Sequence, residues 1–80
     1  MKREELRRIV ADVLEIKPEQ LGSDTDLTAI ETFDSVGILT LMIALDEQGG
    51  IKLGPADMRG LRHYSDIEKQ AANHGATLTD

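Results

Sequence analysis

The chemistry available to this chain centres on one hydroxyl, that of Ser35, in the segment Phe33-Asp34-Ser35-Val36. An acidic loop ends here and a strongly apolar helix is predicted to begin, so Ser35 stands at a helix N-terminus directly after a carboxylate. Such an end presents unpaired N–H groups and the positive end of the helix dipole, which together stabilise phosphate. A serine there either caps the helix or carries a phosphate-linked group, and the local residues leave both alternatives open.

Other groups of polar residues offer little chemistry. Residues 24–28 begin like a calcium-binding loop, but Ala29 and Ser35 stand where glycine and glutamate are required. His63 and His74 have no third ligand near them, so a metal site is not predicted. No Gly-x-Ser-x-Gly turn surrounds the serine and no histidine lies close to it, which argues against a hydrolytic triad. We therefore predict no catalytic residues and a protein that is not itself an enzyme.

Length and composition narrow the class of protein. Eighty residues make one small domain, and the absence of cysteine means that any thiol chemistry must come from an added group. The net charge is −6, and from Val10 to Ile51 a single basic residue, Lys17, stands among nine acidic ones. This acidic middle repels nucleic acid and favours basic partner surfaces. The longest apolar stretch, residues 36–45, is far shorter than the ~20 residues that cross a bilayer, and no signal-peptide core precedes it. We expect a soluble, cytoplasmic monomer with no membrane insertion.

Helical spacing and end signals predict an all-α fold that positions Ser35. We expect helices over Lys2–Glu15, Ser35–Gln48 and Tyr64–Asn73, and a short one over Ala56–Leu61 behind Gly54 and Pro55. A turn at Lys17–Leu21 and a polar loop at Gly22–Thr32, anchored by Leu27 and Ile30, connect the first two. The prediction is a small four-helix bundle of three longer helices and one short one. It forms a single domain over residues 1–75, with a flexible C-terminal tail at 76–80.

The second helix is apolar over most of its circumference. A bundle of this size cannot bury such a helix completely, so part of its apolar surface should face solvent or partners. We assign the inward face to Leu39, Met42, Leu45 and Ile38. The outward stripe then comprises Val36, Thr40, Ile43 and Glu47. The alternative is that Val36 and Ile43 are scattered surface residues of no special role.

The order of these features resembles that of the acyl carrier proteins over residues 2–73. The segment Leu27–Val36 resembles the attachment motif of that family, and Leu45–Leu53 resembles the signature at the end of its second helix. The resemblance implies that Ser35 bears 4′-phosphopantetheine, donated by coenzyme A through a phosphopantetheinyl transferase. Asp34 is then a recognition and positioning residue. The terminal thiol of the arm would hold an acyl or aminoacyl group as a thioester, supplying the thiol that this chain, without cysteine, lacks.

The resemblance also implies surfaces and partners. The expected partners are the transferase, an acyl- or aminoacyl-loading ligase, and a ketosynthase or acyltransferase of lipid, fatty-acid or polyketide-type synthesis. The surface expected to bind them comprises Phe33, Val36, Thr40, Ile43 and Glu47. The residues expected to line an acyl chain sequestered in the bundle are Leu39, Met42, Leu61, Tyr64 and Ile67. An ordinary closed core is the alternative for this last set.

Four positions depart from the fatty-acid-synthesis carriers. Gly37 and Thr40 stand where those proteins usually have acidic residues, Gly49 replaces a bulky apolar residue, and Phe33 places an aromatic ring beside the serine. These departures favour a specialised stand-alone carrier with a dedicated partner. Two alternatives stay open at this point. One is an aminoacyl or peptidyl carrier loaded by a dedicated ligase, and the other, of a different class, is an unmodified helical protein-interaction module.

Overall fold

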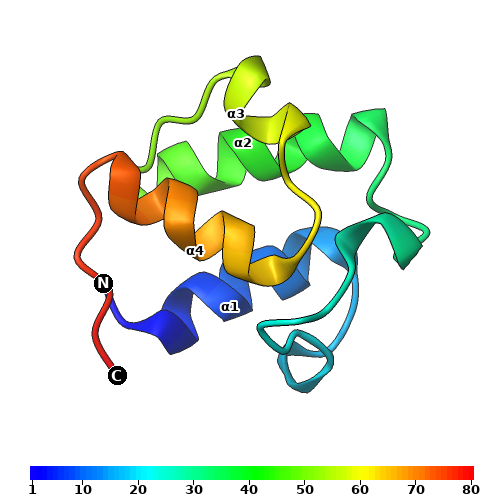
Figure 1. The fold of residues 1–80 in the computed structure, drawn as a ribbon, viewed down its shortest axis with the longest axis horizontal. Coiled ribbons are helices and arrows are strands. Elements are labelled where there is room, and N and C mark those ends of the chain that lie inside the picture. Colours follow the sequence, from blue (N-terminus) through cyan, green and yellow to red (C-terminus); the bar gives the residue numbers. More distant parts are fainter.

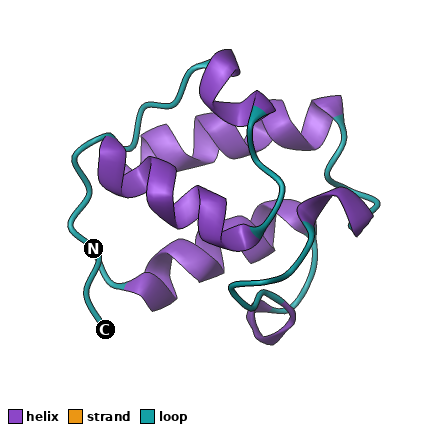
Figure 2. Cartoon of the chain, in the orientation of Figure 1, coloured by secondary structure: helices purple, strands orange, loops and turns teal.

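The computed structural model describes residues 1–80 and contains four α-helices and no strand (Figures 1 and 2). The helices are α1 (Arg3–Leu14), α2 (Ser35–Gly49), α3 (Pro55–Arg59) and α4 (Tyr64–Asn73). Two 3₁₀ turns, Pro18–Gln20 and Leu27–Ala29, lie between α1 and α2. The predicted bundle of three longer helices and one short one is confirmed. None of the helices combines the length and the apolar character that crossing a bilayer requires.

The helices begin and end where local signals place them. The α2 helix closes at Gly50, whose φ of 66° is the left-handed conformation that glycine adopts freely. The N–H groups of Gly50 and Ile51 donate to carbonyls of the last turn at 3.0 Å each. Helix α4 has the predicted bounds, and α1 and α2 agree with prediction to within one residue at each end. Helix α3 ends earlier than predicted, at Arg59, because the chain then turns to place Leu61 in the core.

One apolar core holds the bundle together. In Figure 1 the chain runs from left to right in α1 and from right to left in α2, so these two helices are antiparallel, and α4 packs against both. Every buried residue is apolar except for the phenol of Tyr64, over whose ring the Arg7 guanidinium lies at 5.6 Å. Burial raises the pKa of the Tyr64 hydroxyl. The buried residues are Leu6, Ile9, Val10, Ala11, Leu14, Leu21, Leu27, Leu41, Ala44, Leu45, Ile51, Leu53, Met58, Leu61, Tyr64, Ile67 and Ala71.

The orientation of α2 differs from the prediction. Its buried face is formed by Leu41, Ala44 and Leu45, with Ile38 and Met42 partly buried beside them. The assignment of Leu39 to the inward face is wrong, since this residue is 56% exposed. Apolar residues lie nearly all round α2, so spacing alone did not distinguish the face that α1 covers.

Hydrogen bonds hold the long connection between α1 and α2 against the segment before α4 and against the end of α1. The N–H of Leu27 donates to the carbonyl of Arg62 at 2.7 Å, and the N–H of Tyr64 donates to the carbonyl of Thr25 at 2.9 Å. The hydroxyl of Thr32 donates to the carbonyl of Leu14 at 2.6 Å, at the end of α1. Leu27 is fully buried, as predicted for an anchor, and Ile30 is partly buried. These bonds fix the point at which α2 begins.

The C-terminal residues lie beside the N-terminus. The N–H of Arg3 donates to the carbonyl of Thr79 at 2.8 Å, and the N–H of Thr79 donates to the carbonyl of Met1 at 3.0 Å. The side chains of Arg3 and Asp80 form an ion pair at 3.1 Å. The structure therefore gives this segment partners that the sequence did not suggest. Its flexibility in solution stays a prediction.

Candidate functional site

At the start of α2, Ser35 does not cap the helix and its hydroxyl makes no hydrogen bond within the chain. Asp34 is the N-cap, and its carboxylate accepts a hydrogen bond from the N–H of Gly37 at 2.8 Å. Ser35 is therefore the first helical residue, its side chain is exposed, and no group of the chain hydrogen-bonds its hydroxyl. The alternative that Ser35 caps the helix is thus contradicted, because the preceding carboxylate performs that role.

The same helix end suits a negatively charged substituent. The N–H groups of Ser35 and Val36 have no acceptor within the chain, whereas those of Gly37 and Ile38 are satisfied by Asp34. Free N–H groups at the start of a 15-residue helix, together with its dipole, stabilise a phosphate. The Ser35 hydroxyl is exposed at that end and is accessible to a modifying enzyme. The donor set therefore fits a phosphate-linked group on Ser35.

Gly37 has a role that the sequence did not reveal. A Cβ at this position would overlap the carbonyl oxygen of Thr32 and lie 3.2 Å from its carbonyl carbon. Only glycine lets the loop backbone approach the first turn of α2 this closely. The same loop residue is hydrogen-bonded to the end of α1. Gly37 thus permits the contact that sets the position of Ser35 relative to α1.

An apolar face extends from the serine along α2. The three large apolar side chains of the chain that are exposed all lie on this helix, at Val36 (73%), Leu39 (56%) and Ile43 (49%). Their spacing of three and four residues puts them on one side of the helix. Thr40 and Glu47 are also exposed, and the Thr40 hydroxyl donates to the carbonyl of Val36 at 2.8 Å. Phe33, by contrast, is partly buried against the core.

A groove of about 330 Å³ begins at Ser35 and lies between α2 and α3. It is lined by Ser35, Ile38, Leu39, Met42, Pro55, Met58 and Arg59. A smaller hollow of about 200 Å³ shares Leu39 and Met42 with it and extends toward Leu53. An attached group on Ser35 thus has an apolar surface directly beside it.

The groove contains only part of the predicted acyl-lining set. Leu39 and Met42 line it, whereas Leu61, Tyr64 and Ile67 lie in the closed core. Sequence reasoning missed Ile38, Pro55 and Arg59 as lining residues. Their proximity to Ser35 depends on how α3 packs on α2, and no local pattern signals it. Met58, also a lining residue, lies in the short helix that the sequence predicted, but it was not among the expected lining residues.

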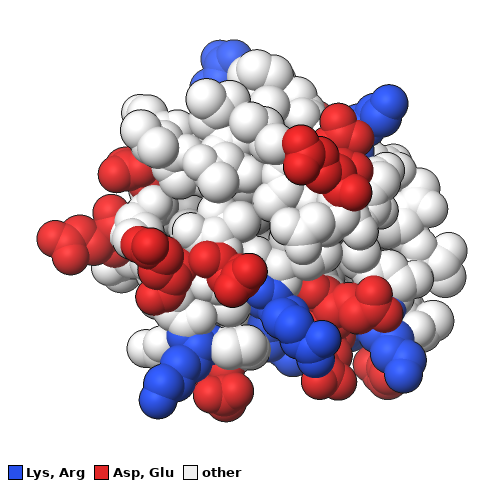
Figure 3. Space-filling view, turned by 180° about the vertical axis from the view of Figure 1, so that it is seen from behind, with Lys and Arg blue, Asp and Glu red and all other residues white.

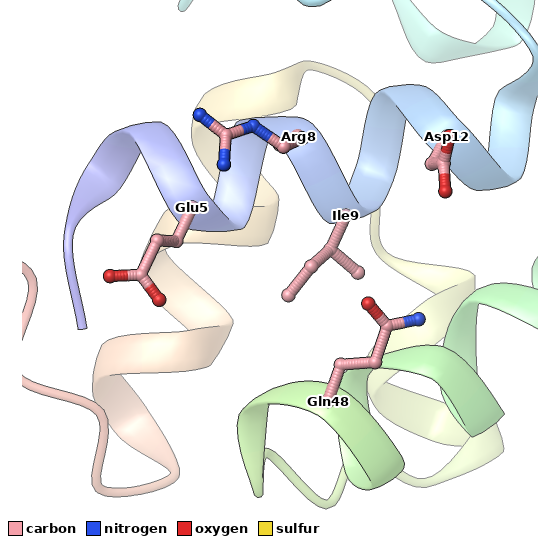
Figure 4. A pocket seen from close by; sticks show the side chains of 5 residues that line it. All are labelled: Glu5, Arg8, Ile9, Asp12 and Gln48. Carbon is pink, nitrogen blue, oxygen red and sulfur yellow. The ribbon is translucent and has the colours of Figure 1, made fainter.

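A second, more polar hollow of about 240 Å³ lies between α1 and the end of α2 (Figure 4). Glu5, Arg8, Ile9 and Asp12 of α1 line it together with Gln48 of α2, whose amide points toward the α1 helix. Gln48 is 13 residues after Ser35, about 20 Å along the helix axis at 1.5 Å per residue. This hollow therefore belongs to the opposite end of the molecule from the serine.

Charge is distributed unevenly over the surface. Seen from the side opposite to Figure 1, the lower part of the molecule carries interleaved basic and acidic side chains (Figure 3). The upper part is mostly uncharged, with a cluster of acidic side chains at the upper right and separate basic groups at its edges. Four of the five ion pairs use Arg3, Arg8 or Lys69 of α1 and α4, and none involves a residue of α2. Residues 35–45 of α2 contain no charged residue, so the surface of this helix is uncharged until the exposed Asp46 and Glu47 in its last turn.

The chain matches one known protein family over most of its length. The family model described as the phosphopantetheine attachment site matches residues 4–71 of the 80. The match extends from the first turn of α1 into the last turn of α4. It includes the start of α2 and the whole of the groove.

Proposed function

Because the chain belongs to the phosphopantetheine attachment-site family, and is therefore a carrier whose cofactor is covalently attached 4′-phosphopantetheine, we propose that the arm is bound to Ser35. The observation that supports this assignment is the free, exposed hydroxyl at the first position of α2. In the loading reaction the Ser35 oxygen forms a phosphoester bond to the pantetheine-bearing phosphorus of coenzyme A and gives up its proton. The pyrophosphate bond of coenzyme A breaks, and 3′,5′-ADP leaves. Asp34 holds the helix start in place and marks the site for the transferase.

The two other serines show why the site is specific. Ser65 also lies in the first turn of a helix, but its N–H donates to the carbonyl of Ser23 at 3.1 Å. The loop that carries Ser23 therefore covers the start of α4. The start of α2 has no such cover, and Ser35 is the one serine with free helix N–H groups beside it.

The test is the intact mass of the protein after incubation with coenzyme A, magnesium and a broad-specificity phosphopantetheinyl transferase. We expect a gain of one phosphopantetheine, which Ser35→Ala abolishes and Ser65→Ala preserves. Circular dichroism of each variant checks that the fold is intact. A well-folded protein that gains no mass with several transferases would overturn the assignment. The remaining explanation would then be the interaction module, in which the exposed face of α2 binds a partner without modification.

We propose further that the cargo is an acyl group and that the protein presents it to enzymes of lipid, fatty-acid or polyketide-type synthesis. The apolar groove beside Ser35 supports an acyl chain over an amino acid, because Met42, Met58 and Leu39 offer no partner for an ammonium group. When bound, the arm supplies a thiol that holds the cargo as a thioester. The chain itself contributes binding surfaces and no catalysis. Partner enzymes dock on Val36, Thr40, Ile43 and Glu47, which form the exposed side of α2, with Phe33 at its edge.

The three methionines offer a direct probe of the cargo. Met42 and Met58 line the groove, whereas Met1 lies against Gly49 at the other end of α2. We expect that octanoyl-phosphopantetheine, transferred from octanoyl coenzyme A, shifts the methyl resonances of Met42 and Met58 relative to the unacylated arm and leaves that of Met1 unchanged. An alanyl group should leave all three in place. Equal spectra for both cargoes would favour the aminoacyl or peptidyl carrier instead.

A further inference from the structure

Arg59 is the one cation that lines the groove beginning at Ser35. The other lining residues are Ile38, Leu39, Met42, Pro55 and Met58, all without charge. Arg59 is the last residue of α3, and the C-terminal turn of α3 lies over the N-terminal half of α2 (Figure 1). A single guanidinium is therefore placed at an otherwise apolar groove, beside an exposed hydroxyl.

The guanidinium of Arg59 has no carboxylate partner in the chain. The five ion pairs of the structure involve other cations. The acidic residue of its own helix, Asp57, is engaged elsewhere. Its carboxylate accepts from the N–H of Gly54 at 2.8 Å and contacts the His74 imidazole at 3.3 Å. Arg59 is exposed, so its planar donor group is free to bind an anion.

Two sets of donors without a partner in the chain are thus found at the groove that begins at Ser35. The free N–H groups of Ser35 and Val36 lie at the start of α2, and Arg59 lies across the groove from them. Arginine binds phosphate oxygens through two parallel N–H groups more specifically than lysine does. We propose that Arg59 binds the phosphodiester of the arm on Ser35 and thereby directs the arm into the groove between α2 and α3. This inference rests on the proposed attachment at Ser35.

Arg59 is a binding residue for the prosthetic group, distinct from the exposed side of α2 that meets partner enzymes. The phosphodiester is permanently charged near neutral pH, so the contact is insensitive to pH and sensitive to salt. An exposed pair is weakened as the screening length falls from about 10 Å at 0.1 M salt to about 3 Å at 1 M. The arm is therefore held to the groove at low ionic strength and released from it as salt rises.

The first measurement uses the unaltered protein. The Nε–H resonances of the arginine side chains are recorded in the unloaded and the loaded protein at low salt. We expect the Arg59 signal to move on loading while that of Arg62, three positions later and also unpaired, stays in place. An Arg59 signal that is identical in the two forms, on protein shown by mass to be loaded, overturns the proposal.

The second measurement follows the phosphorus itself. The ³¹P resonance of loaded wild type should move as NaCl rises from 20 mM to 1 M, and converge on that of loaded Arg59→Gln, which should respond little to salt. Arg59→Lys should retain part of the salt response, and Arg62→Gln should match wild type. An Arg59→Gln protein with the wild-type ³¹P resonance at both salt concentrations refutes the role of Arg59. Failure of the wild type to gain the mass of the arm refutes instead the attachment at Ser35, so the two failures are distinguishable.

Discussion

Replacing Gly37 with alanine separates what helix propensity predicts from what the tertiary contact predicts. Gly37 is the third residue of α2, and its N–H donates to the N-cap Asp34. Considered as a helix residue alone, alanine should stabilise the protein by up to ~1 kcal/mol over glycine. The structure predicts the opposite sign, because the added Cβ would overlap the carbonyl oxygen of Thr32.

The magnitude follows from what must move. The atom that is hit is backbone, and the hydroxyl of the same residue, Thr32, is hydrogen-bonded to the carbonyl of Leu14, so the loop cannot simply retreat. Forcing an extra carbon into a fixed contact costs typically ~1–3 kcal/mol. After a propensity gain of up to ~1 kcal/mol is subtracted, the free energy of unfolding of Gly37→Ala should fall by up to ~2 kcal/mol. For a domain of this size a fall of ~2 kcal/mol corresponds to a loss of roughly 8–16 °C in Tm.

The assay is urea unfolding followed by circular dichroism, with Gly60→Ala as the matched control. Gly60 has a helical φ of −85°, and its nearest neighbour to a new Cβ is 4.0 Å away, so alanine fits there without strain. We expect the midpoint to fall for Gly37→Ala and to stay level or rise for Gly60→Ala. A Gly37→Ala protein as stable as wild type would refute the close approach of the loop. A slower gain of phosphopantetheine by the destabilised variant would indicate that the contact also positions the serine.

Three further outcomes are expected. Asp34→Ala should lower the free energy of unfolding by ~0.5–2 kcal/mol through loss of the N-cap, whereas Asp34→Asn should retain most of it, as measured by urea unfolding. Leu41→Ala should lower the free energy of unfolding by ~2–5 kcal/mol because Leu41 is fully buried, whereas Leu39→Ala should change it little because Leu39 is exposed. Equal losses in the two variants would contradict the orientation of α2. The backbone N–H groups of His63 and Arg62 hold the pKa of Asp66 below its usual 3.8, so its contribution to stability is complete above that value and is lost as pH falls through the lower folded pKa. Thermal melts between pH 6 and pH 2 should accordingly show less acid sensitivity in Asp66→Asn than in wild type, and parallel curves would contradict this.

Most of the helices could be predicted because their signals are local. Apolar residues at helical spacing marked α1 and α4, and glycines marked where α2 and α4 end. Pro55 after Gly54 marked the start of α3. Asp34 before Ser35 marked the start of α2 and, through the family resemblance, the proposed attachment site. Each of these depends on residues within about one turn of each other.

The burial of α2 could not be predicted for the converse reason. Its apolar residues surround the helix, so burying Leu39 and burying Leu41 were equally compatible with the sequence. The choice was made by the neighbours, since α1 covers Leu41, Ala44 and Leu45 and leaves Leu39 beside the groove. Gly37 was misinterpreted in the same way. Its sequence context suggested only a missing acidic residue, whereas the structure shows that glycine permits a close contact with the backbone of Thr32.

The sequence by itself determined the number of helices, the ends of the three longer ones to within one residue, and the position of one serine behind one carboxylate. Backbone capping and helical spacing are set by adjacent residues. Only the tertiary structure decided that the Ser35 hydroxyl is exposed and has no hydrogen-bond partner. It also decided that α2 and α3 enclose a groove, and that Arg59 lines this groove together with a serine 24 positions earlier in the chain. These features arise where two elements distant in the chain come together. They depend on which surfaces pack against each other in the folded core, and no short stretch of the sequence specifies this packing.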